Sequence, residues 1–368
     1  LRVAAAAVVQ WYAQARGTLC VFGDTNVYWS LAESLRHGLP YEVSQWGVPH
    51  RILRPPGYPL FLAACQSLFG DRLLPVRLVQ AALGTLCVGL VGQLARRLSP
   101  RPDPVPGPAR TPAVPMLAAC LLAFEPYSAA LSALVLSEAL FVPWMLAALL
   151  GVACLWTGPD QQPPRAPTWV AVATGAAIGA ALGTRPSWAV FVPLVLVCWR
   201  LQAGRSATRA IVIVALAAAA VLAPWWIRNA QVSGRFVPFA LWMGASLHDG
   251  LNPKATGASD MEFLNEPAFW PLTESDQDRA LTQTAWTFTR GQPREAARLA
   301  LVKAARFWCP WPNAETFQRP WLNLASALVT LPLYGLMILG LWRCRRDLRA
   351  WVLLAGPLLY FGALHMIF

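Results

Sequence analysis

Four ionisable residues stand beside strongly apolar segments of this 368-residue chain, and their types are suited to group transfer. Asp24 lies in GDTNVYWSLAESLRHG, Arg54 in ILRPPGYPLFLA, Glu138 in LSALVLSEALFVPW and Arg185 in GTRPSW. A charge at or near membrane depth is costly unless it is paired or hydrated, so such residues mark candidate sites. A carboxylate can take a proton from a hydroxyl, and a guanidinium fork suits a phosphodiester. Together they predict transfer of a group from a lipid-linked phosphate donor.

Both acids also have a structural interpretation. Asp24 is placed to cap a helix that runs to His37 and stops at Gly38. Glu138 opens an apolar helix after Ser137, where a negative charge favours the helix dipole. The sequence alone leaves capping and chemistry open for both residues, and the two roles are compatible.

The arginines have their own alternatives. Pro55 and Pro56 stiffen the backbone that follows Arg54, so its side chain projects from a rigid, extended segment. The alternative is an arginine that snorkels toward lipid headgroups, which is the commoner fate of arginine near a membrane interface. Arg185 precedes Pro186 in a short turn and is suited to anchoring the chain at the interface.

The composition indicates a membrane protein. Hydrophobic residues make up 56% of the chain and charged residues 13%, against about 25% charged in soluble domains. The net charge of +12 is spread over short loops between apolar runs instead of being gathered on one soluble face, which excludes a nucleic-acid partner. The lipid bilayer is therefore the expected environment.

The apolar runs predict an all-α polytopic fold of about nine transmembrane helices with further interfacial helices. The expected spans are 3–20, 74–96, 112–130, 138–156, 168–184, 186–200, 208–227, 321–342 and 350–368. Arginine-rich loops at 96–110, 200–209 and 343–349 then fall on one side, which the positive-inside rule makes cytoplasmic. A further crossing by the short apolar run 57–70 would move the loop at 96–110 to the other side of the membrane. We therefore expect a re-entrant or interfacial helix there.

The same count of membrane crossings places two long polar segments outside. Residues 21–73 form a first outer loop with interfacial helices, and residues 228–320 form a large outer loop. We expect one membrane-embedded domain over 1–368, in the plasma (inner) membrane. The chain begins with Leu1 and ends within the apolar run YFGALHMIF, so both ends look cut from a longer chain.

Five segments in this order resemble the C-type glycosyltransferase (GT-C) superfamily, in the branch of the protein mannosyltransferases and the lipid A aminoarabinose transferases. They are GDTNVYWSLAESLRHG, RPPGYPLFLAACQSLFG, LVLSEALF, GTRP and APWWIRNAQVSGRFVPF. The resemblance implies a multi-pass enzyme that transfers a sugar from a polyprenyl-phosphate carrier to an acceptor hydroxyl, with inversion, at the extracytoplasmic face.

The resemblance also implies roles for individual residues. Asp24 matches the acid used as general base, and Glu138 matches a second acid that helps to place the acceptor or a divalent cation. Arg54 and Arg185 match the basic residues expected near the donor phosphate. The supporting residues of the site are Tyr28, Tyr58, Arg228 and Asn229.

The implied partners are a polyprenyl-phosphate-sugar donor and an acceptor glycolipid, glycan or protein. No cofactor is indicated with certainty; a divalent cation, if bound, would use Asp24 and Glu138. A lipid or glycolipid transporter or flippase is the alternative function, since transporters also keep charged residues at membrane depth. A transporter typically places them near the midplane and shows internal repeats, whereas these charges gather at one interface.

Overall fold

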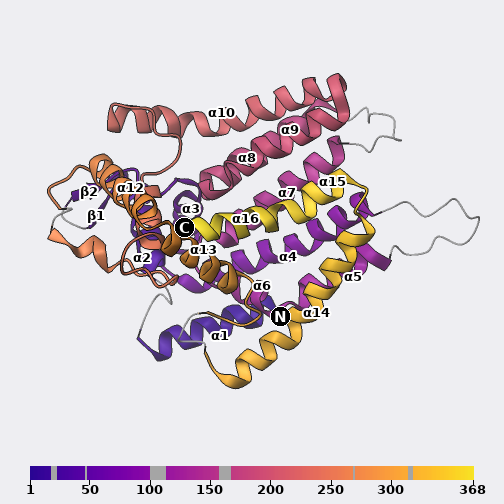
Figure 1. The fold of residues 1–368 in the computed structure, drawn as a ribbon, viewed down its shortest axis with the longest axis horizontal. Helices are drawn as coiled ribbons and strands as arrows, with labels where there is room; N and C mark the ends of the chain where they lie inside the picture. Colours follow the sequence, from indigo (N-terminus) through magenta and orange to yellow (C-terminus); the bar gives the residue numbers. More distant parts are fainter. Residues whose placement is uncertain (18–22, 46–47, 100–112, 157–166, 268–269, 314–317) are drawn as a thin grey trace, which may run out of the picture. The chain divides into compact units, whose positions relative to one another are not determined.

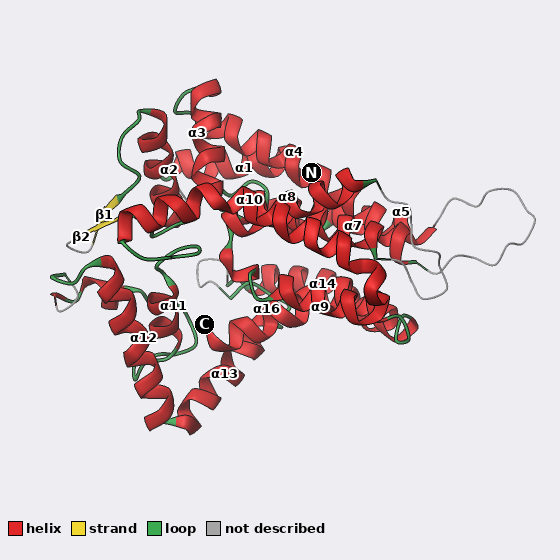
Figure 2. Cartoon of the chain, turned by 90° about the horizontal axis from the view of Figure 1, so that it is seen from above, coloured by secondary structure: helices red, strands yellow, loops and turns green. Residues whose placement is uncertain are grey.

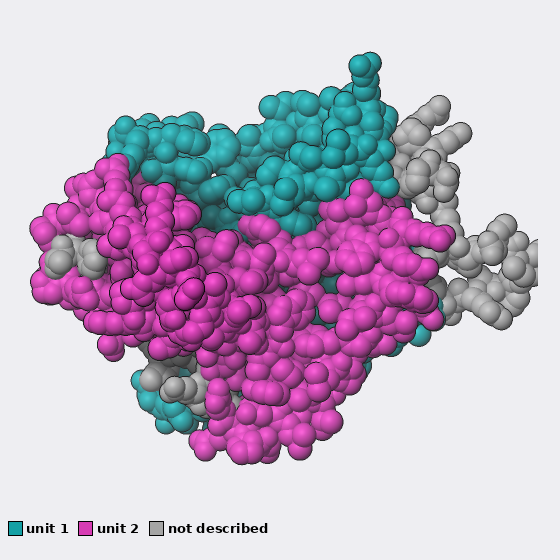
Figure 3. Space-filling model, in the orientation of Figure 1, with its two compact units in different colours: residues 1–43, 54–239 teal, residues 44–53, 240–368 magenta. Residues whose placement is uncertain are grey.

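The computed structural model describes residues 1–17, 23–45, 48–99, 113–156, 167–267, 270–313 and 318–368. The chain divides into two compact units, coloured separately in Figure 3. Unit 1 comprises residues 1–43 and 54–239, and unit 2 comprises residues 44–53 and 240–368. Helices dominate both units, as the sequence predicts (Figure 2).

Unit 1 is built from helices that coincide closely with the predicted apolar runs. They are α1 (Arg2–Ala15), α2 (Gly23–Arg36), α3 (Gly57–Phe69), α4 (Leu73–Leu98), α5 (Ala113–Phe124), α6 (Pro126–Leu131), α7 (Glu138–Leu155), α8 (Thr168–Thr184), α9 (Phe191–Ala203) and α10 (Thr208–Ser233). Short 3-10 turns, Pro186–Trp188 and Gly204–Ala207, precede α9 and α10. Helices α5, α4, α7, α8 and α10 pack successively against one another, and Figure 1 shows them side by side.

Small residues allow α8 to lie close to α10. A Cβ added at Gly175 would come within 2.3 Å of the Val214 carbonyl oxygen, and one at Gly179 within 2.8 Å of the Ala218 oxygen. This spacing of four residues is the small-xxx-small pattern that lets membrane helices approach closely. The contact fixes the end of α8, and with it Arg185, which directly follows the helix.

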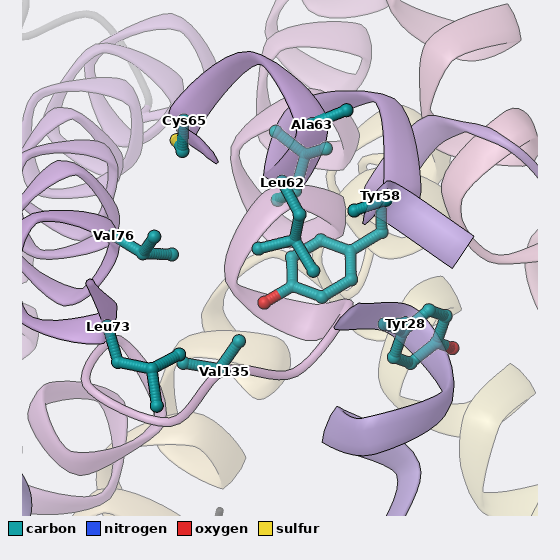
Figure 4. Close-up of a cluster of buried hydrophobic side chains, with 10 residues drawn as sticks. Tyr28, Tyr58, Leu62, Ala63, Cys65, Leu73, Val76 and Val135 are labelled. Carbon is teal, nitrogen blue, oxygen red and sulfur yellow. The ribbon is translucent and has the colours of Figure 1, made fainter. Parts of the chain in front are cut away.

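A buried cluster joins the short helices to the long ones (Figure 4). Tyr28 of α2, Tyr58 and Leu62 of α3, Val76 of α4 and Val135 before α7 pack together in it, each at most 8% exposed. Burying an aromatic or leucine side chain contributes about 1.5–3 kcal/mol, so this cluster is a substantial tie between segments distant in sequence. It includes residues of the segments that carry Asp24 and Glu138.

One expected span is interrupted. The run 112–130 was predicted as a single helix, but α5 ends at Phe124 and α6 begins at Pro126. The prediction was wrong there because Pro126 disfavours a helical conformation at Glu125, whose ψ is 116°. The Arg2 guanidinium donates to the Leu122 and Ala123 carbonyls at 3.1 and 3.3 Å, which satisfies carbonyl groups at the end of α5.

Unit 2 contains a two-stranded sheet and the remaining helices. Its elements are β1 (Val43–Gln45, the first residue belonging to unit 1), β2 (Val48–His50), α11 (Met243–Gly250), a 3-10 turn (Glu262–Asn265), α12 (Glu274–Gly291), α13 (Pro293–Phe307), α14 (Pro320–Arg343), α15 (Leu348–Ala350), a π turn (Trp351–Ala355) and α16 (Gly356–Ile367). The Glu274 carboxylate accepts from the backbone N–H groups of Arg51 and Ile52 at 2.9 and 3.0 Å, which ties residues 44–53 to α12.

Five helical stretches in the described residues are long and apolar enough to cross a membrane. They are Leu73–Leu98, Glu138–Leu155, Pro186–Ser233, Pro320–Arg343 and Leu348–Ile367; the apolar helices Ala113–Phe124 and Thr168–Thr184 are shorter. The stretch from Pro186 holds two of the predicted spans. The predicted arginine-rich loop at 96–110 lies mostly outside the described residues.

Candidate functional site

Asp24 and Arg54 form an ion pair in unit 1, with Arg54 Nη2 at 2.9 Å from Asp24 Oδ1. The two partners differ in exposure: the Arg54 side chain is 11% exposed, whereas that of Asp24 is 57% exposed. Arg54 is therefore held within the unit by its partner and by burial. Asp24 presents its carboxylate at an accessible surface of the unit.

Glu138 and Arg185 form a second ion pair, between Glu138 Oε1 and Arg185 Nη1. Their side chains are 33% and 35% exposed, so this pair is also open to solvent. Glu138 is the first residue of α7, and Arg185 follows the last residue of α8. Because α7 and α8 pack together, the start of one and the end of the other meet at the same side of the unit.

Tyr28 and Ser137 lie between the two ion pairs. The Arg54 guanidinium carbon is 5.8 Å from the centre of the Tyr28 ring, which is a cation–π distance. The Tyr28 hydroxyl donates to Ser137 Oγ at 3.4 Å, and Arg185 Nη1 donates to the same oxygen at 3.4 Å. Tyr28 thereby joins all four charged residues into one cluster within unit 1.

The local structure explains why these segments meet. Thr25 Oγ1 donates to the Val135 carbonyl at 2.9 Å, which holds the first turn of α2 beside the residues that lead into α7. Tyr58 packs edge-on against Tyr28 with ring centres 5.0 Å apart, and its hydroxyl accepts from Gln80 Nε2 at 2.9 Å. The two tyrosines predicted to support the site are thus packed together beside it.

The structure alters the local interpretation of two predicted residues. Helix α2 begins at Gly23, so Asp24 lies in the first turn and is not the N-cap that the sequence suggested. The helix ends at Arg36, with Gly38 at φ +66° as its stop. Trp188 is 2% exposed, so the turn after Arg185 is packed inward.

Arg228 and Asn229 lie near the end of α10 and make contacts different from those of the four charged residues. Asn229 is fully buried and its Nδ2 donates to the Val237 carbonyl at 2.9 Å. Arg228 donates to the Tyr41 carbonyl at 3.0 Å, and its guanidinium lies over the rings of Tyr41 and Trp225. Sequence reasoning missed Tyr41, because a single tyrosine in a polar loop has no periodic or motif signal.

The two acids of the cluster, Asp24 and Glu138, are the residues that a divalent cation would use. The described part of the chain contains no group of three or more His, Cys, Asp or Glu side chains able to hold a metal ion. Asp24 and Glu138 each pair with an arginine, which competes with a cation for the same oxygens.

Long apolar helices and a charged cluster at helix ends together define a multi-pass membrane protein. The chain belongs to the dolichyl-phosphate-mannose-protein mannosyltransferase family, whose profile matches residues 56–240. It is a GT-C glycosyltransferase, which confirms the resemblance noted in the sequence. The matched range includes Glu138, Arg185 and Arg228, whereas Asp24 and Arg54 precede it.

Among solved structures, the chain is similar to ArnT from Cupriavidus metallidurans, crystallised with undecaprenyl phosphate. The two chains are 17% identical with a TM-score of 0.49, over 99% of this chain and 74% of that chain. No protein of curated function matches the sequence. The family assignment therefore rests on the profile match.

Proposed function

We propose that this protein is an inverting glycosyltransferase that moves a sugar from a polyprenyl-phosphate donor to an acceptor hydroxyl of a protein, glycolipid or cell-envelope glycan. The reaction takes place at the extracytoplasmic face of a membrane crossed by about nine helices. The observation that carries the proposal is the Asp24–Arg54 pair, in which an exposed carboxylate stands 2.9 Å from a buried guanidinium. The family's named donor, dolichyl-phosphate-mannose, supports a lipid-linked phosphate as substrate.

Asp24 is the proposed general base. An acceptor hydroxyl is a weak nucleophile, and a carboxylate within hydrogen-bond reach takes its proton as the new bond forms. The hydroxyl oxygen bonds to the anomeric carbon while the bond from that carbon to the phosphate oxygen breaks, and the electron pair leaves with the phosphate. A single displacement of this kind inverts the anomeric configuration.

Arg54 and Arg185 are the proposed phosphate ligands. The leaving phosphate gains negative charge in the transition state, and fixed positive charge nearby lowers the barrier. A guanidinium carries five N–H donors, so Arg54 can bind the phosphate without losing Asp24. Glu138 holds Arg185 in place and is suited to binding the acceptor, because it is one-third exposed beside Ser137.

The test is transfer of labelled mannose from dolichyl-phosphate-mannose by the purified full-length chain, with a membrane extract as the source of acceptors. We expect Asp24→Asn to lower the rate by about 10²–10⁴-fold, the usual contribution of a general base. Donor binding should remain, because the asparagine keeps the shape of the side chain. Full transfer by Asp24→Asn would remove Asp24 as the base.

Asp71→Asn is the matched control. Asp71 also pairs with an arginine, Arg36, at 2.8 Å, and its side chain is likewise 57% exposed. An exposed ion pair contributes about 0–1 kcal/mol, so this variant should fold and transfer like the wild type. A similar loss in both aspartate variants would assign the effect to ion pairing and not to base catalysis.

A further inference from the structure

The backbone around Arg54 has an unusual hydrogen-bonding requirement. Arg54 and Pro55 are buried and belong to no helix or strand, so regular structure does not supply hydrogen-bond partners for their carbonyl groups. Pro55 and Pro56 have no N–H, and both prolines restrict how the segment can turn to find partners. The carbonyls of Arg54 and Pro55 therefore need a donor from elsewhere in the fold.

Tyr41 supplies that donor. Its hydroxyl lies 3.0 Å from the Arg54 carbonyl oxygen and 3.3 Å from the Pro55 oxygen, so a single proton is shared between adjacent carbonyls. Burial raises the pKa of the Tyr41 hydroxyl well above its usual value, against a smaller lowering effect of Arg228. The hydroxyl consequently stays protonated at neutral pH and remains available as a donor.

Tyr41 is itself fixed by the end of α10. The Arg228 guanidinium lies 5.2 Å from the centre of the Tyr41 ring and donates to the Tyr41 carbonyl at 3.0 Å. The Trp225 ring meets the same tyrosine edge-on at 5.5 Å. Tyr41 is thus held through both its ring and its backbone, which a merely space-filling residue would not require.

The support continues into the segment that follows α10. The Trp225 indole donates to the Phe239 carbonyl at 2.6 Å, and Asn229 donates to the Val237 carbonyl at 2.9 Å. Asn229 Oδ1 also accepts from Arg228 Nη1 at 3.3 Å. Through these bonds the WWIRN sequence of α10 holds Arg228 at the place where it contacts Tyr41.

We propose that Tyr41, held by Arg228, is a positioning residue for Arg54. It fixes the Arg54 backbone and so sets where the guanidinium meets the donor phosphate. The proposal rests on the proposed function, because it assumes that Arg54 binds that phosphate. Displacing a binding group by about 1 Å can cost as much as 10²-fold in activity, so the anchoring of Arg54 matters to the reaction.

The test uses undecaprenyl phosphate in detergent micelles as the probe, with the full chain and its tyrosine variant. Tyr41→Phe keeps the ring against Arg228 and Trp225 and removes only the hydroxyl. We expect binding about fivefold to tenfold weaker, as for one lost hydrogen bond. The thermal unfolding midpoint should fall by only a few degrees, because one hydrogen bond is lost while the ring contacts remain.

Repeating the Tyr41→Phe substitution in an Arg54→Gln variant separates positioning of Arg54 from a general effect of Tyr41 on the structure. In Arg54→Gln, which has no guanidinium to position, Tyr41→Phe should cause no further loss of undecaprenyl phosphate binding. An equal proportional loss in both backgrounds would overturn the proposal. If Tyr41→Phe does not fold, Arg228→Lys tests the same support, because lysine lacks the planar group that lies over the ring.

Tyr334→Phe is the matched control, since its hydroxyl also donates to a backbone carbonyl, that of Trp308, at 3.4 Å. It should bind the probe like the wild type. If Arg54→Gln weakens binding and Tyr41→Phe binds normally, Arg54 keeps its phosphate role, and the proposal that Tyr41 positions it is refuted. Normal binding by Arg54→Gln would overturn both the phosphate role of Arg54 and this proposal.

Discussion

Replacing Gly57 with alanine tests how the two arginine-bearing segments are brought together. Gly57 is the first residue of α3, three residues after Arg54, and it faces the end of α8 just before Arg185. A Cβ at position 57 would lie 2.7 Å from the Gly183 carbonyl oxygen and 2.7 Å from Thr184 Oγ1. Rotation of Thr184 relieves only the second contact, because the first is with backbone.

The size of the effect follows from these distances. Ordinary contact begins at 3.4 Å, so α3 and α8 must separate by about 0.7 Å. Overpacking of this kind costs about 1–3 kcal/mol, which in a unit of this size lowers the unfolding midpoint by several degrees. Because Arg54 precedes Gly57 by three residues and Arg185 directly follows Thr184, the displacement also changes the spacing of the two guanidinium groups. We expect transfer from the donor to fall by about tenfold or more.

The assay is mannose transfer and thermal unfolding of Gly57→Ala beside Gly89→Ala. Gly89 lies within α4, and a Cβ there would meet nothing within 4 Å. Its replacement should be neutral or stabilise by about 0.5–1 kcal/mol, since alanine favours a helix. If Gly57→Ala has wild-type stability and transfer, the close approach of α3 and α8 does not determine the spacing of Arg54 and Arg185.

Two further predictions concern pH and metal. Burial lowers the pKa of His248 below 6.5, against smaller raising effects of Glu266 and Asp249. As the pH falls, this histidine is therefore protonated in the unfolded chain before it is protonated in the folded protein. Stability should therefore be complete above about pH 6.5 and decline as the pH falls below it, and His248→Gln should reduce that decline in thermal unfolding. Glu138→Gln should lower transfer through loss of its pair with Arg185. A chelator should leave wild-type transfer unchanged, because Asp24 and Glu138 are each held by an arginine that competes with a cation for the carboxylate oxygens. Inhibition by the chelator, reversed by added cation, would contradict that expectation.

The helices were predictable because the bilayer and the apolar runs leave few alternatives. Backbone groups must be satisfied within each segment in lipid, so long apolar runs become helices. Structure and prediction agree to within a few residues for α4, α7, α8 and α14. The same reasoning placed Glu138 at the first residue of α7 and found α3 as a short separate helix. The interruption at Glu125 was missed because hydropathy outweighed the local signal of Pro126.

The residues of the candidate site were also predictable, whereas the ion pairs that they form were not. The cost of charge near lipid singles out Asp24, Arg54, Glu138 and Arg185 from one sequence. Nothing in their spacing says which acid pairs with which arginine, or that Tyr28 lies between the pairs. Those contacts depend on close approaches at Gly57 and along α8, which are set by packing across the unit.

The sequence by itself thus determined a helical membrane protein and the four charged residues of its candidate site, because hydropathy and the cost of burying charge act on each segment separately. Only the tertiary structure decided that Arg54 is buried while Asp24 remains open, and that Tyr41 holds the Arg54 carbonyl. Burial and hydrogen bonding to a distant residue depend on what other segments place alongside, and no local pattern encodes that.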